Sequence, residues 1–283
     1  MKTENNANLA RYASFRTGGN ADTLVTPANI YELTSALKEY GCENVYGCLS
    51  NTLVSDRGVR GAVILTTSVR GIELHGDTVA ACAGDTLSSL ASFACANSLS
   101  GAEFCYGIPG TVGGGVFMNA GAYGGEIKDI FKSAVLFSEK DGVFGLDAKD
   151  MGFGYRASVL QKEKYILLKA YFRLEKGDKA QIRGRMDELM ARRREKQPLE
   201  YPSCGSVFKR PEGNFAGALI EQCGLKGARA GGAEVSRKHA GFIINAGGAT
   251  SEDMLALTAL VKRTVRERTG VELEEEIRFL GEK

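Results

Sequence analysis

A glycine-rich stretch at residues 107–125 is the part of the sequence best suited to hold an anion. It reads GIPGTVGGGVFMNAGAYGG, and eight of these residues are glycine. Because glycine has no Cβ and tolerates positive φ, its backbone N–H groups can surround a phosphate. Little of the stretch is charged, so amides rather than lysines would do the binding. A tight structural loop between packed elements explains the composition equally well.

The stretch differs from the two common glycine-rich nucleotide motifs. Its spacing does not fit G-x-G-x-x-G, and no Lys-Ser/Thr pair follows the glycines as in a P-loop. A second candidate loop is Ser50, Asn51 and Thr52, between two apolar runs. Its side chains and amides could contact a phosphate, or they could make a local turn. The basic run 192–196 ends a predicted helix, where positive charge suits the helix dipole, and phosphate binding is the alternative.

No spacing in the sequence is typical of a metal site. The seven cysteines form no C-x-x-C pair, and the only histidines are His75 and His239. Scattered thiols, in a chain whose N-terminus lacks a signal-peptide core, predict reduced cysteines that act as small apolar residues in a cytoplasmic protein. No apolar run approaches the roughly 18 residues that a membrane span needs. We therefore expect neither a metal nor a membrane partner.

Length and composition are those of an ordinary globular protein with more than one domain. The 283 residues suffice for two or three domains, and 43% hydrophobic with 25% charged residues is a usual balance. The 36 basic and 34 acidic residues leave a net charge of +2, so nothing indicates a nucleic-acid partner. Without a long coiled coil or a strong apolar stripe, a monomer is expected.

The periodicity of apolar residues predicts a mixture of helices and strands. The clearest strand is 165–176, where alternate residues from Ile166 to Leu174 are apolar and share one face. Because the order lacks a regular βαβ rhythm, we predict an α+β fold rather than one doubly wound sheet. Further helices are predicted from a cap at Asn29 to Gly41, at 86–97, at about 180–195, through Leu219 to Gly224 and from a cap at Thr250 to Gly270, with further strands at 78–83, 132–138, 142–146, 240–245 and 274–281.

The glycine stretch, extended to GIPGTVGGGVFMNAGAYGGEIKD, resembles a motif of the UDP-N-acetylenolpyruvoylglucosamine reductase family, flavoenzymes of peptidoglycan precursor synthesis. The resemblance covers nearly the whole chain, and a series of motifs in order is far more specific than any single one. The short connection after GYR resembles the compact branch of the family, which lacks an extra substrate-covering loop. The other matching motifs are SFRTGGNAD, LSNTLVSDRGVRGAVI, GYRASV, YPSCGSVFKRP, GLKGARAGGAEVSRKHAGFIIN and LEEEIRFLG.

The resemblance implies an FAD-binding region of the p-cresol methylhydroxylase and vanillyl-alcohol oxidase type, followed by a separate α+β substrate domain. Residues 1–178 would form the FAD-binding region, with subdomains at about 1–68 and 69–178, and residues 179–283 the substrate domain. It also implies the reaction: NADPH reduces FAD, and the enolpyruvyl group of a UDP-sugar receives the hydride. That chemistry needs a cation on the substrate carboxylate, a proton donor and a group that orients them.

Three residues match the catalytic positions of the family. Arg156 in GYR is the cation, because a guanidinium holds a carboxylate bidentately and stays charged. Ser206 in CGSVF is the proton donor and needs a neighbour that stabilises its alkoxide; Lys209 is close in sequence. Glu276 is the acidic residue, chosen over Glu274 because it directly precedes Ile-Arg. Without the resemblance, a surface arginine and a turn-capping serine would be the ordinary interpretations.

The resemblance also assigns binding residues. It places FAD at Gly47, Ser50, Asn51, Thr52, Leu53, Gly107, Ile108, Pro109, Gly110, Val112, Gly113, Gly114, Asn119 and Gly121, and the substrate at Tyr123, Lys196, Lys209 and Lys238. Cys204 and His239 lie in matching motifs, but we interpret both as structural rather than as nucleophile or base.

Two features separate this chain from the family pattern. Cys48 and Leu49 stand in the first flavin loop, which usually carries more glycine, and a leucine there limits close approach of the backbone. Gly115 stands where alanine is frequent. Two other functions remain: a related FAD oxidase or dehydrogenase would lack the Ser206 and Glu276 motifs, and a flavin- or nucleotide-binding regulatory protein would have replaced all three catalytic residues.

Overall fold

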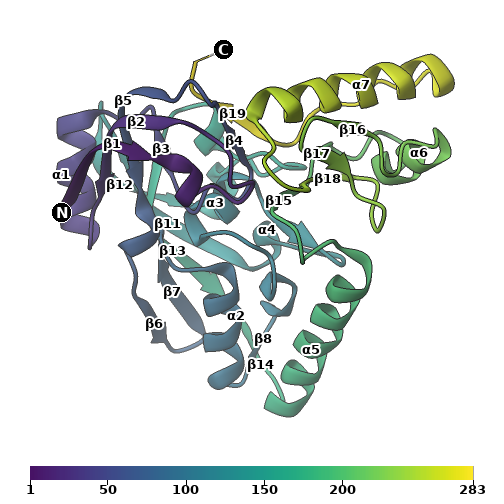
Figure 1. Ribbon diagram of the computed structural model, residues 1–283. Coiled ribbons are helices and arrows are strands. Elements are labelled where there is room, and N and C mark those ends of the chain that lie inside the picture. Colours follow the sequence, from purple (N-terminus) through teal and green to yellow (C-terminus); the bar gives the residue numbers. More distant parts are fainter. Residues whose placement is uncertain (283) are drawn as a thin grey trace. The chain divides into compact units, whose positions relative to one another are not determined.

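The computed structural model describes residues 1–282, and the chain groups into two compact units (Figure 1). Unit 1 comprises residues 1–4, 23–48 and 62–192, and unit 2 comprises residues 5–22, 49–61 and the chain from 193 onward. Within residues 1–282, no helix is long and apolar enough to cross a membrane. The domain boundaries expected near residues 68 and 178 stay predictions.

Unit 1 is built on a five-stranded antiparallel sheet of order β12-β11-β13-β7-β6. The apolar faces of its strands pack in two buried clusters, one with helix α2 and one with helix α1. The strands are β6 (Ile72–His75), β7 (Thr78–Cys82), β11 (Phe131–Ser138), β12 (Gly142–Asp147) and β13 (Ile166–Arg173).

Strand β13 has the predicted apolar alternation, but a bulge divides it between the two clusters. A register shift in its pairing with β11 leaves Leu168 as an extra residue. Leu168 packs in the cluster that contains α1, whereas Ala170 and Phe172 pack in the cluster that contains α2. The prediction that residues 166–174 share one face is therefore wrong across the bulge.

The ends of the helices in unit 1 follow their local sequence. The Asn29 side chain accepts a hydrogen bond from the Glu32 amide at 2.9 Å, and Gly41, with a φ of 83°, ends the same helix. The glycine stretch contains a short helix that the sequence did not predict, with Thr111 as its N-cap. The helices are α1 (Ile30–Tyr40), α2 (Leu87–Ala96), α3 (Val112–Phe117), α4 (Ile127–Ile130) and α5 (Lys179–Lys196).

Apart from the strand Thr52–Val54, the strands before residue 177 that lie outside this five-stranded sheet form one further sheet and two short pairs. A four-stranded sheet has the order β1-β2-β5-β3, and two-residue strands pair as β10-β9 and β14-β8. Their bounds are β1 (Lys2–Asn8), β2 (Asn20–Thr26), β3 (Val45–Tyr46), β5 (Val59–Leu65), β8 (Leu99–Ser100), β9 (Gly121–Ala122), β10 (Gly125–Glu126) and β14 (Glu175–Lys176).

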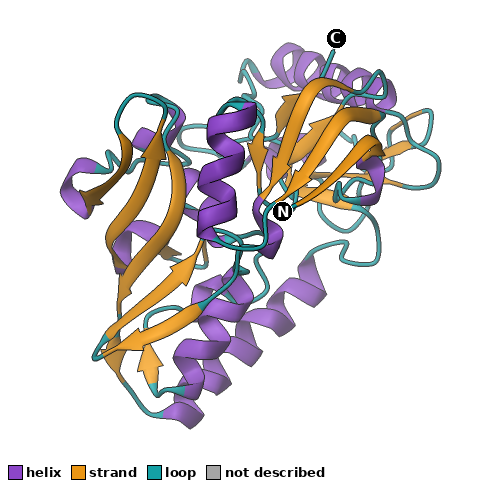
Figure 2. Ribbon diagram, turned by 90° about the vertical axis from the view of Figure 1, so that its left-hand side faces the viewer, coloured by secondary structure: helices purple, strands orange, loops and turns teal. Residues whose placement is uncertain are grey.

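Unit 2 packs two helices with a four-stranded antiparallel sheet of order β15-β18-β17-β16. A separate parallel pair joins β4 to β19, the last strand of the chain. Figure 2 shows these strands in orange and the helices in purple. The bounds are β4 (Thr52–Val54), β15 (Ser203–Ser206), β16 (Arg229–Ala230), β17 (Ala233–Val235), β18 (Phe242–Asn245), β19 (Arg278–Leu280), α6 (Ala216–Gln222) and α7 (Ser251–Thr269).

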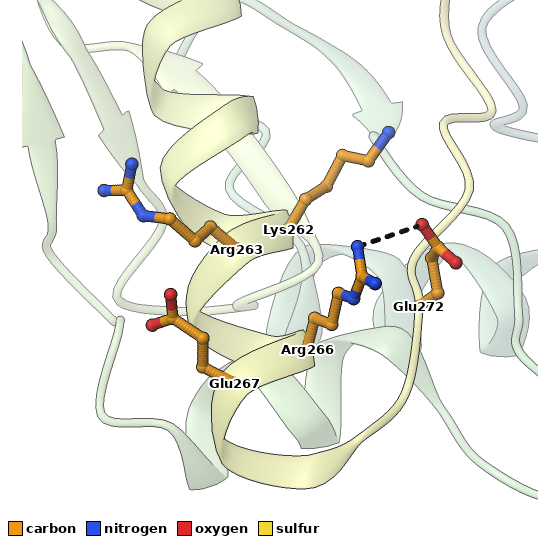
Figure 3. A pocket seen from close by; sticks show the side chains of 5 residues that line it. All are labelled: Lys262, Arg263, Arg266, Glu267 and Glu272. Carbon is orange, nitrogen blue, oxygen red and sulfur yellow. Dashed lines mark ion pairs between the residues drawn. The ribbon is translucent and has the colours of Figure 1, made fainter.

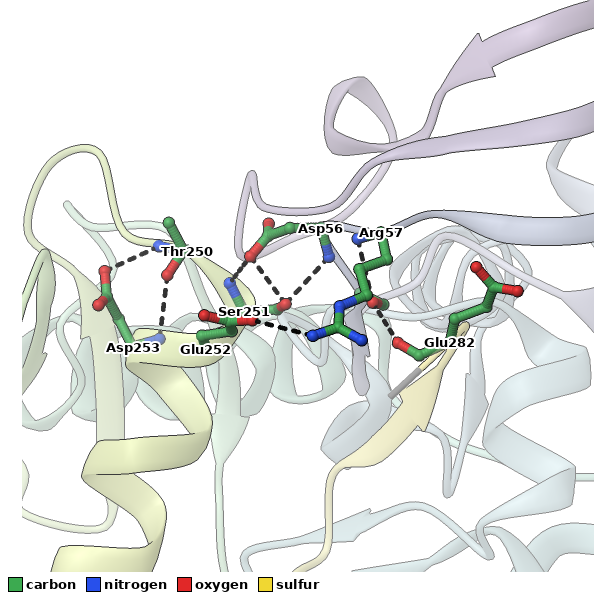
Figure 4. Close-up of polar contacts among 8 residues, drawn as sticks. Asp56, Arg57, Thr250, Ser251, Glu252, Asp253 and Glu282 are labelled. Carbon is green, nitrogen blue, oxygen red and sulfur yellow. Dashed lines mark hydrogen bonds and ion pairs between the residues drawn. The ribbon is translucent and has the colours of Figure 1, made fainter.

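Polar contacts fix the start of α7 to the segment after β4 (Figure 4). Thr250 and Asp253 form the predicted cap reciprocally, each side chain accepting the other's amide at 3.0 Å. Ser251 donates its hydroxyl to the Asp56 carboxylate at 2.8 Å and accepts the Asp56 amide at 3.0 Å. These hydrogen bonds attach residues 49–61 to the rest of unit 2.

Antiparallel sheets and helices without a βαβ repeat confirm the α+β fold class. Two further local predictions are wrong. Thr52 does not lie in a loop but begins β4, and the last strand covers only Arg278–Leu280 rather than 274–281. Both errors have one cause, since β4 and β19 pair with each other across more than 200 residues of sequence.

Candidate active site

The backbone amides of the glycine stretch mostly bond to the protein itself. The amides of Gly107, Ile108, Val112 and Gly113 donate to oxygens of unit 1 at distances of 2.7 to 3.1 Å. The Gly114 amide donates to the hydroxyl of its N-cap, Thr111. The expectation that bare amides along this stretch surround an anion is therefore wrong for these positions, and their contacts with FAD stay predictions.

Close packing explains several of the glycines instead. A Cβ on Gly115 would lie 2.8 Å from Leu87 Cδ2, so α3 and α2 approach closely at this point. A Cβ on Gly47 would lie 2.2 Å from Thr111 Oγ1, at the cap of α3. The segment that leads into the loop at Ser50–Thr52 thus packs directly on the glycine stretch within unit 1.

The loop that follows Gly47 presents open amides. Leu49 is buried and has a φ of 50°, a left-handed conformation that favours glycine. Within residues 1–282, the amides of Ser50 and Asn51 donate to no protein oxygen. Successive amides next to a left-handed residue form the kind of concavity that binds phosphate. These amides lie at Ser50 and Asn51, where the resemblance predicts contacts with FAD, and those contacts stay predictions.

Ser206 and Glu276 lie on neighbouring segments of unit 2. The Glu276 amide donates to the carbonyl of Val207 at 2.8 Å, and the Lys209 amide donates to that of Glu274 at 2.8 Å. Ser206 is the last residue of β15, so its hydroxyl is one residue from this contact, and it donates to the carbonyl of Phe208 at 3.0 Å. Two of the three predicted catalytic residues are thus brought together by backbone pairing.

The open loop is tied to the same segments. The Asn51 side-chain amide donates to the Glu276 carbonyl at 3.0 Å, and the Arg278 amide donates to the Asn51 carbonyl at 3.0 Å. The buried thiol of Cys204, on β15, lies 3.5 Å from the carbonyl of Thr52. These contacts were not predicted, because they depend on the pairing of β4 with β19 and not on local pattern.

The neighbours of Glu276 have other partners. Glu274 forms an ion pair with Lys209, and Glu275 forms one with Lys262 at 2.8 Å. The ammonium group of Lys209 therefore pairs with Glu274. This is the lysine that we considered for stabilising the serine alkoxide.

Arg156 lies in a tight turn of unit 1, close to the end of the glycine stretch. Its φ is 53°, and its guanidinium donates to the Gly121 carbonyl at 3.3 Å. Asn119, predicted to contact FAD, has a fully buried side chain whose amide donates to Glu126 and to the carbonyl of Gly154, both at 2.9 Å. That side chain supports the turn, and a contact with FAD stays a prediction.

The remaining substrate candidates are dispersed. Tyr123 has a φ of 54° and is partly exposed, and Lys196 is the last residue of α5. Lys238 donates to the carbonyl of Arg194 at 2.6 Å, in the last turn of the same helix. A strained backbone in non-glycine residues is frequent at functional sites, and Leu49, Asn119, Tyr123 and Arg156 all have it.

His239 has the features of a structural histidine. Burial lowers its pKa, which favours the neutral ring. Its Nδ1 accepts the Gly241 amide at 3.1 Å, and its ring packs edge-on against Phe242. Among residues 1–282, no group of three or more His, Cys, Asp and Glu side chains could hold a metal ion.

A hollow on the surface of α7 contains none of the predicted site residues. It is lined by five charged side chains, and Arg266 lies 4.0 Å from Glu272 across it (Figure 3). The other lining residues are Lys262, Arg263 and Glu267. Its mixed charges have no connection to the chemistry predicted for Ser206 and Glu276.

Comparison with known proteins gives consistent similarities. Residues 197–280 match the family model described as UDP-N-acetylenolpyruvoylglucosamine reductase, C-terminal domain, and residues 21–143 match that of an FAD binding domain. The reductase of that name from Clostridium novyi is 47% identical over 99% of this chain and 92% of its own length. The one from Streptococcus thermophilus is 49% identical over 97% of this chain and 92% of its own length.

A solved structure is similar over the same range. The crystal structure of UDP-N-acetylenolpyruvylglucosamine reductase from Thermus caldophilus covers 99% of this chain and 98% of its own, with a TM-score of 0.84 and 35% identity. The similarity extends through both units, so it includes the segments that carry Arg156, Ser206 and Glu276.

Proposed function

Because the chain belongs to the UDP-N-acetylenolpyruvoylglucosamine reductase family and is an FAD oxidoreductase, we propose that it reduces UDP-N-acetylglucosamine enolpyruvate to UDP-N-acetylmuramate with NADPH as the electron donor. The observation that carries the proposal is the pairing of the Ser206 and Glu276 segments with the loop whose amides are open. This reaction is a step of peptidoglycan precursor synthesis. We further propose that the enzyme is a cytoplasmic monomer.

The open amides of Ser50 and Asn51 would hold an anionic group of FAD. Bound FAD supplies the hydride chemistry that connects NADPH with the substrate. Gly47, which precedes this loop, packs on Thr111 at the cap of α3 within unit 1. The other FAD contacts expected along residues 107–121 would come from side chains, from carbonyl groups and from the backbone at Gly110. The amides that already bond to protein would not take part.

Arg156 would bind the carboxylate of the substrate. Reduction of the enolpyruvyl group places negative charge on the carbon next to this carboxylate, and a fixed guanidinium stabilises charge that develops there. Arg156 is held within unit 1 by its bond to the Gly121 carbonyl, so little reorganisation would be required at the moment of reaction.

Ser206 would deliver the proton to the same carbon. Its hydroxyl donates to the Phe208 carbonyl in the structure, so the hydrogen must turn from that carbonyl toward the substrate. Glu276, whose amide is bonded to Val207, would orient the substrate or tune the serine. Lys209 is paired with Glu274 and would act on the serine only through a change of partner.

Separate measurement of the two half-reactions tests this proposal. In anaerobic stopped-flow experiments, Ser206→Ala should leave bleaching of the flavin by NADPH within about twofold of the parent, while reoxidation by the enolpyruvyl sugar slows about 100-fold or more. Ser203→Ala, in the same strand, is the control. Equal loss of both half-reactions would reject the proton-donor role. A reduced flavin in the parent protein that the sugar does not reoxidise, and that is reoxidised only after oxygen is admitted, would favour a related oxidase.

Arg156→Ala should slow reoxidation by the sugar by a similar factor while the FAD content is kept. Arg156→Lys should recover part of the rate, because a point charge remains but the bidentate geometry is lost. A variant that merely loses its flavin would show that Arg156 belongs to the cofactor site instead.

A further inference from the structure

Arg156 occupies a turn that places it under backbone strain. Gly154 and Ala157 exchange both amide-to-carbonyl hydrogen bonds, at 3.0 and 3.2 Å, so Tyr155 and Arg156 form a two-residue turn. Arg156 has a φ of 53°, a left-handed conformation that is unfavourable in a residue other than glycine. Such a conformation persists only where the surrounding structure holds it.

One side chain holds the strained residue directly. The Gln161 side-chain amide donates to the Arg156 carbonyl at 2.9 Å and to the Phe117 carbonyl at 2.8 Å. Phe117 is the last residue of α3, so both N–H groups of one side chain connect the turn to the end of that helix. A 3-10 turn over Val159–Gln161 brings the glutamine back toward the turn.

The neighbouring side chain of Ser158 makes one of the two hydrogen bonds that Gln161 makes. The Ser158 hydroxyl donates to the Phe117 carbonyl at 2.8 Å, and its side chain is buried. No hydrogen bond joins the Ser158 side chain to Arg156 within the described residues. Ser158 and Gln161 therefore share one acceptor and differ in whether they also hold the arginine.

We propose that Gln161 is a positioning residue for Arg156. Its amide fixes the carbonyl of the strained arginine to the C-terminal end of α3 and so keeps the guanidinium in place for the substrate carboxylate. The inference rests on the proposed function, because the role of Arg156 is part of it.

Hydrogen exchange tests the positioning independently of any chemistry. In Gln161→Met, which keeps the length of the side chain and removes both donors, the amides of Gly154 and Ala157 should exchange about tenfold faster than in the parent. Ser158→Ala, which removes only the bond to Phe117, should change their exchange by less than threefold. Unchanged exchange in Gln161→Met, or an equal rise in both variants, would overturn the inference. Should Gln161→Met fail to fold, Gln161→Glu keeps the shape and gives the same measurement.

The half-reactions then measure the consequence for catalysis. Gln161→Met should slow reoxidation of the flavin by the enolpyruvyl sugar about tenfold and raise the concentration of sugar needed for half-saturation, with bleaching by NADPH within twofold. Ser158→Ala should leave both steps within about twofold. Faster exchange with unchanged reoxidation would mean that Gln161 holds the turn without positioning Arg156 for the reaction, and it would overturn the inference. Loss of the NADPH step in all variants and in the parent would instead reject the proposed function.

Discussion

The glycine stretch and the loop at residues 47–53 differ in how they use their backbone amides. The stretch has eight glycines, yet the amides of Val112 and Gly113 donate to protein carbonyls and its centre is a helix. The loop has a leucine in the left-handed conformation, and its next two amides are open. Glycine content therefore marks where the backbone packs closely, whereas the open amides follow a single leucine with a positive φ angle.

Substitution of Leu49 gives the largest expected effect. Leu49→Ala should lower the free energy of unfolding by about 2–5 kcal/mol, because the side chain is only 2% exposed. Leu49→Gly loses the same side chain but adopts the positive φ without strain, so it should be about 1 kcal/mol more stable than Leu49→Ala. Urea denaturation of the FAD-free proteins measures both. A Leu49→Gly variant that is less stable than Leu49→Ala, or that has lost its flavin absorbance, would contradict this account of the loop.

Substitution of a glycine by alanine should have opposite effects on stability in the two regions. Gly47→Ala should lower the free energy of unfolding by about 1–3 kcal/mol, since the new Cβ would collide with the Thr111 hydroxyl. Gly114→Ala should be neutral or up to about 1 kcal/mol stabilising, because its Cβ would meet that hydroxyl only at 3.6 Å and alanine favours helix. Thermal and urea unfolding of the pair would test this, and equal losses would show that glycine is required throughout.

The sequence predicted those features that depend on local signals. The caps at Asn29 and Thr250 and the end of α7 at Gly270 agree with the structure, because each depends on residues within one turn of helix. The bulge at Leu168 and the short β19 were missed, because register and pairing with β4 are set by distant strands.

The candidate site likewise contains residues that the sequence predicted and contacts that it did not. Arg156, Ser206 and Glu276 were assigned from motifs in a resemblance, and the pairing of the last two segments was not visible in either motif. Gln161 was missed altogether, because its role depends on a 3-10 turn that returns it to a carbonyl five residues earlier. A glutamine in a polar segment carries no signal of such a contact.

The bridge from the open loop to Glu276 gives an intermediate effect. Asn51→Ala removes a hydrogen bond to the Glu276 carbonyl and should lower the free energy of unfolding by about 1 kcal/mol. FAD affinity should fall by about fivefold if this bond fixes the loop, which fluorescence titration would measure. Asn214→Ala, at a 3.4 Å contact with the Glu212 carbonyl, is the control and should change stability by less than about 0.5 kcal/mol. Unchanged affinity in Asn51→Ala would show that the loop is fixed by β4 alone.

The smallest effect is a difference in thiol reactivity that leaves the fold unchanged. Cys48 lies in the loop and is partly exposed, whereas Cys105, two residues before the glycine stretch, is fully buried. A small disulfide reagent should therefore label Cys48 in the FAD-free protein at least about tenfold faster than Cys105, because access limits the reaction of a buried thiol. Bound FAD should slow labelling of Cys48 several-fold and leave Cys105 unchanged, as followed by mass spectrometry of the labelled peptides, with Cys48→Ser as the control. Since the reagent probes the two regions in one molecule, faster labelling of Cys105, or no protection of Cys48, would reverse the assignment of the open site to residues 47–53.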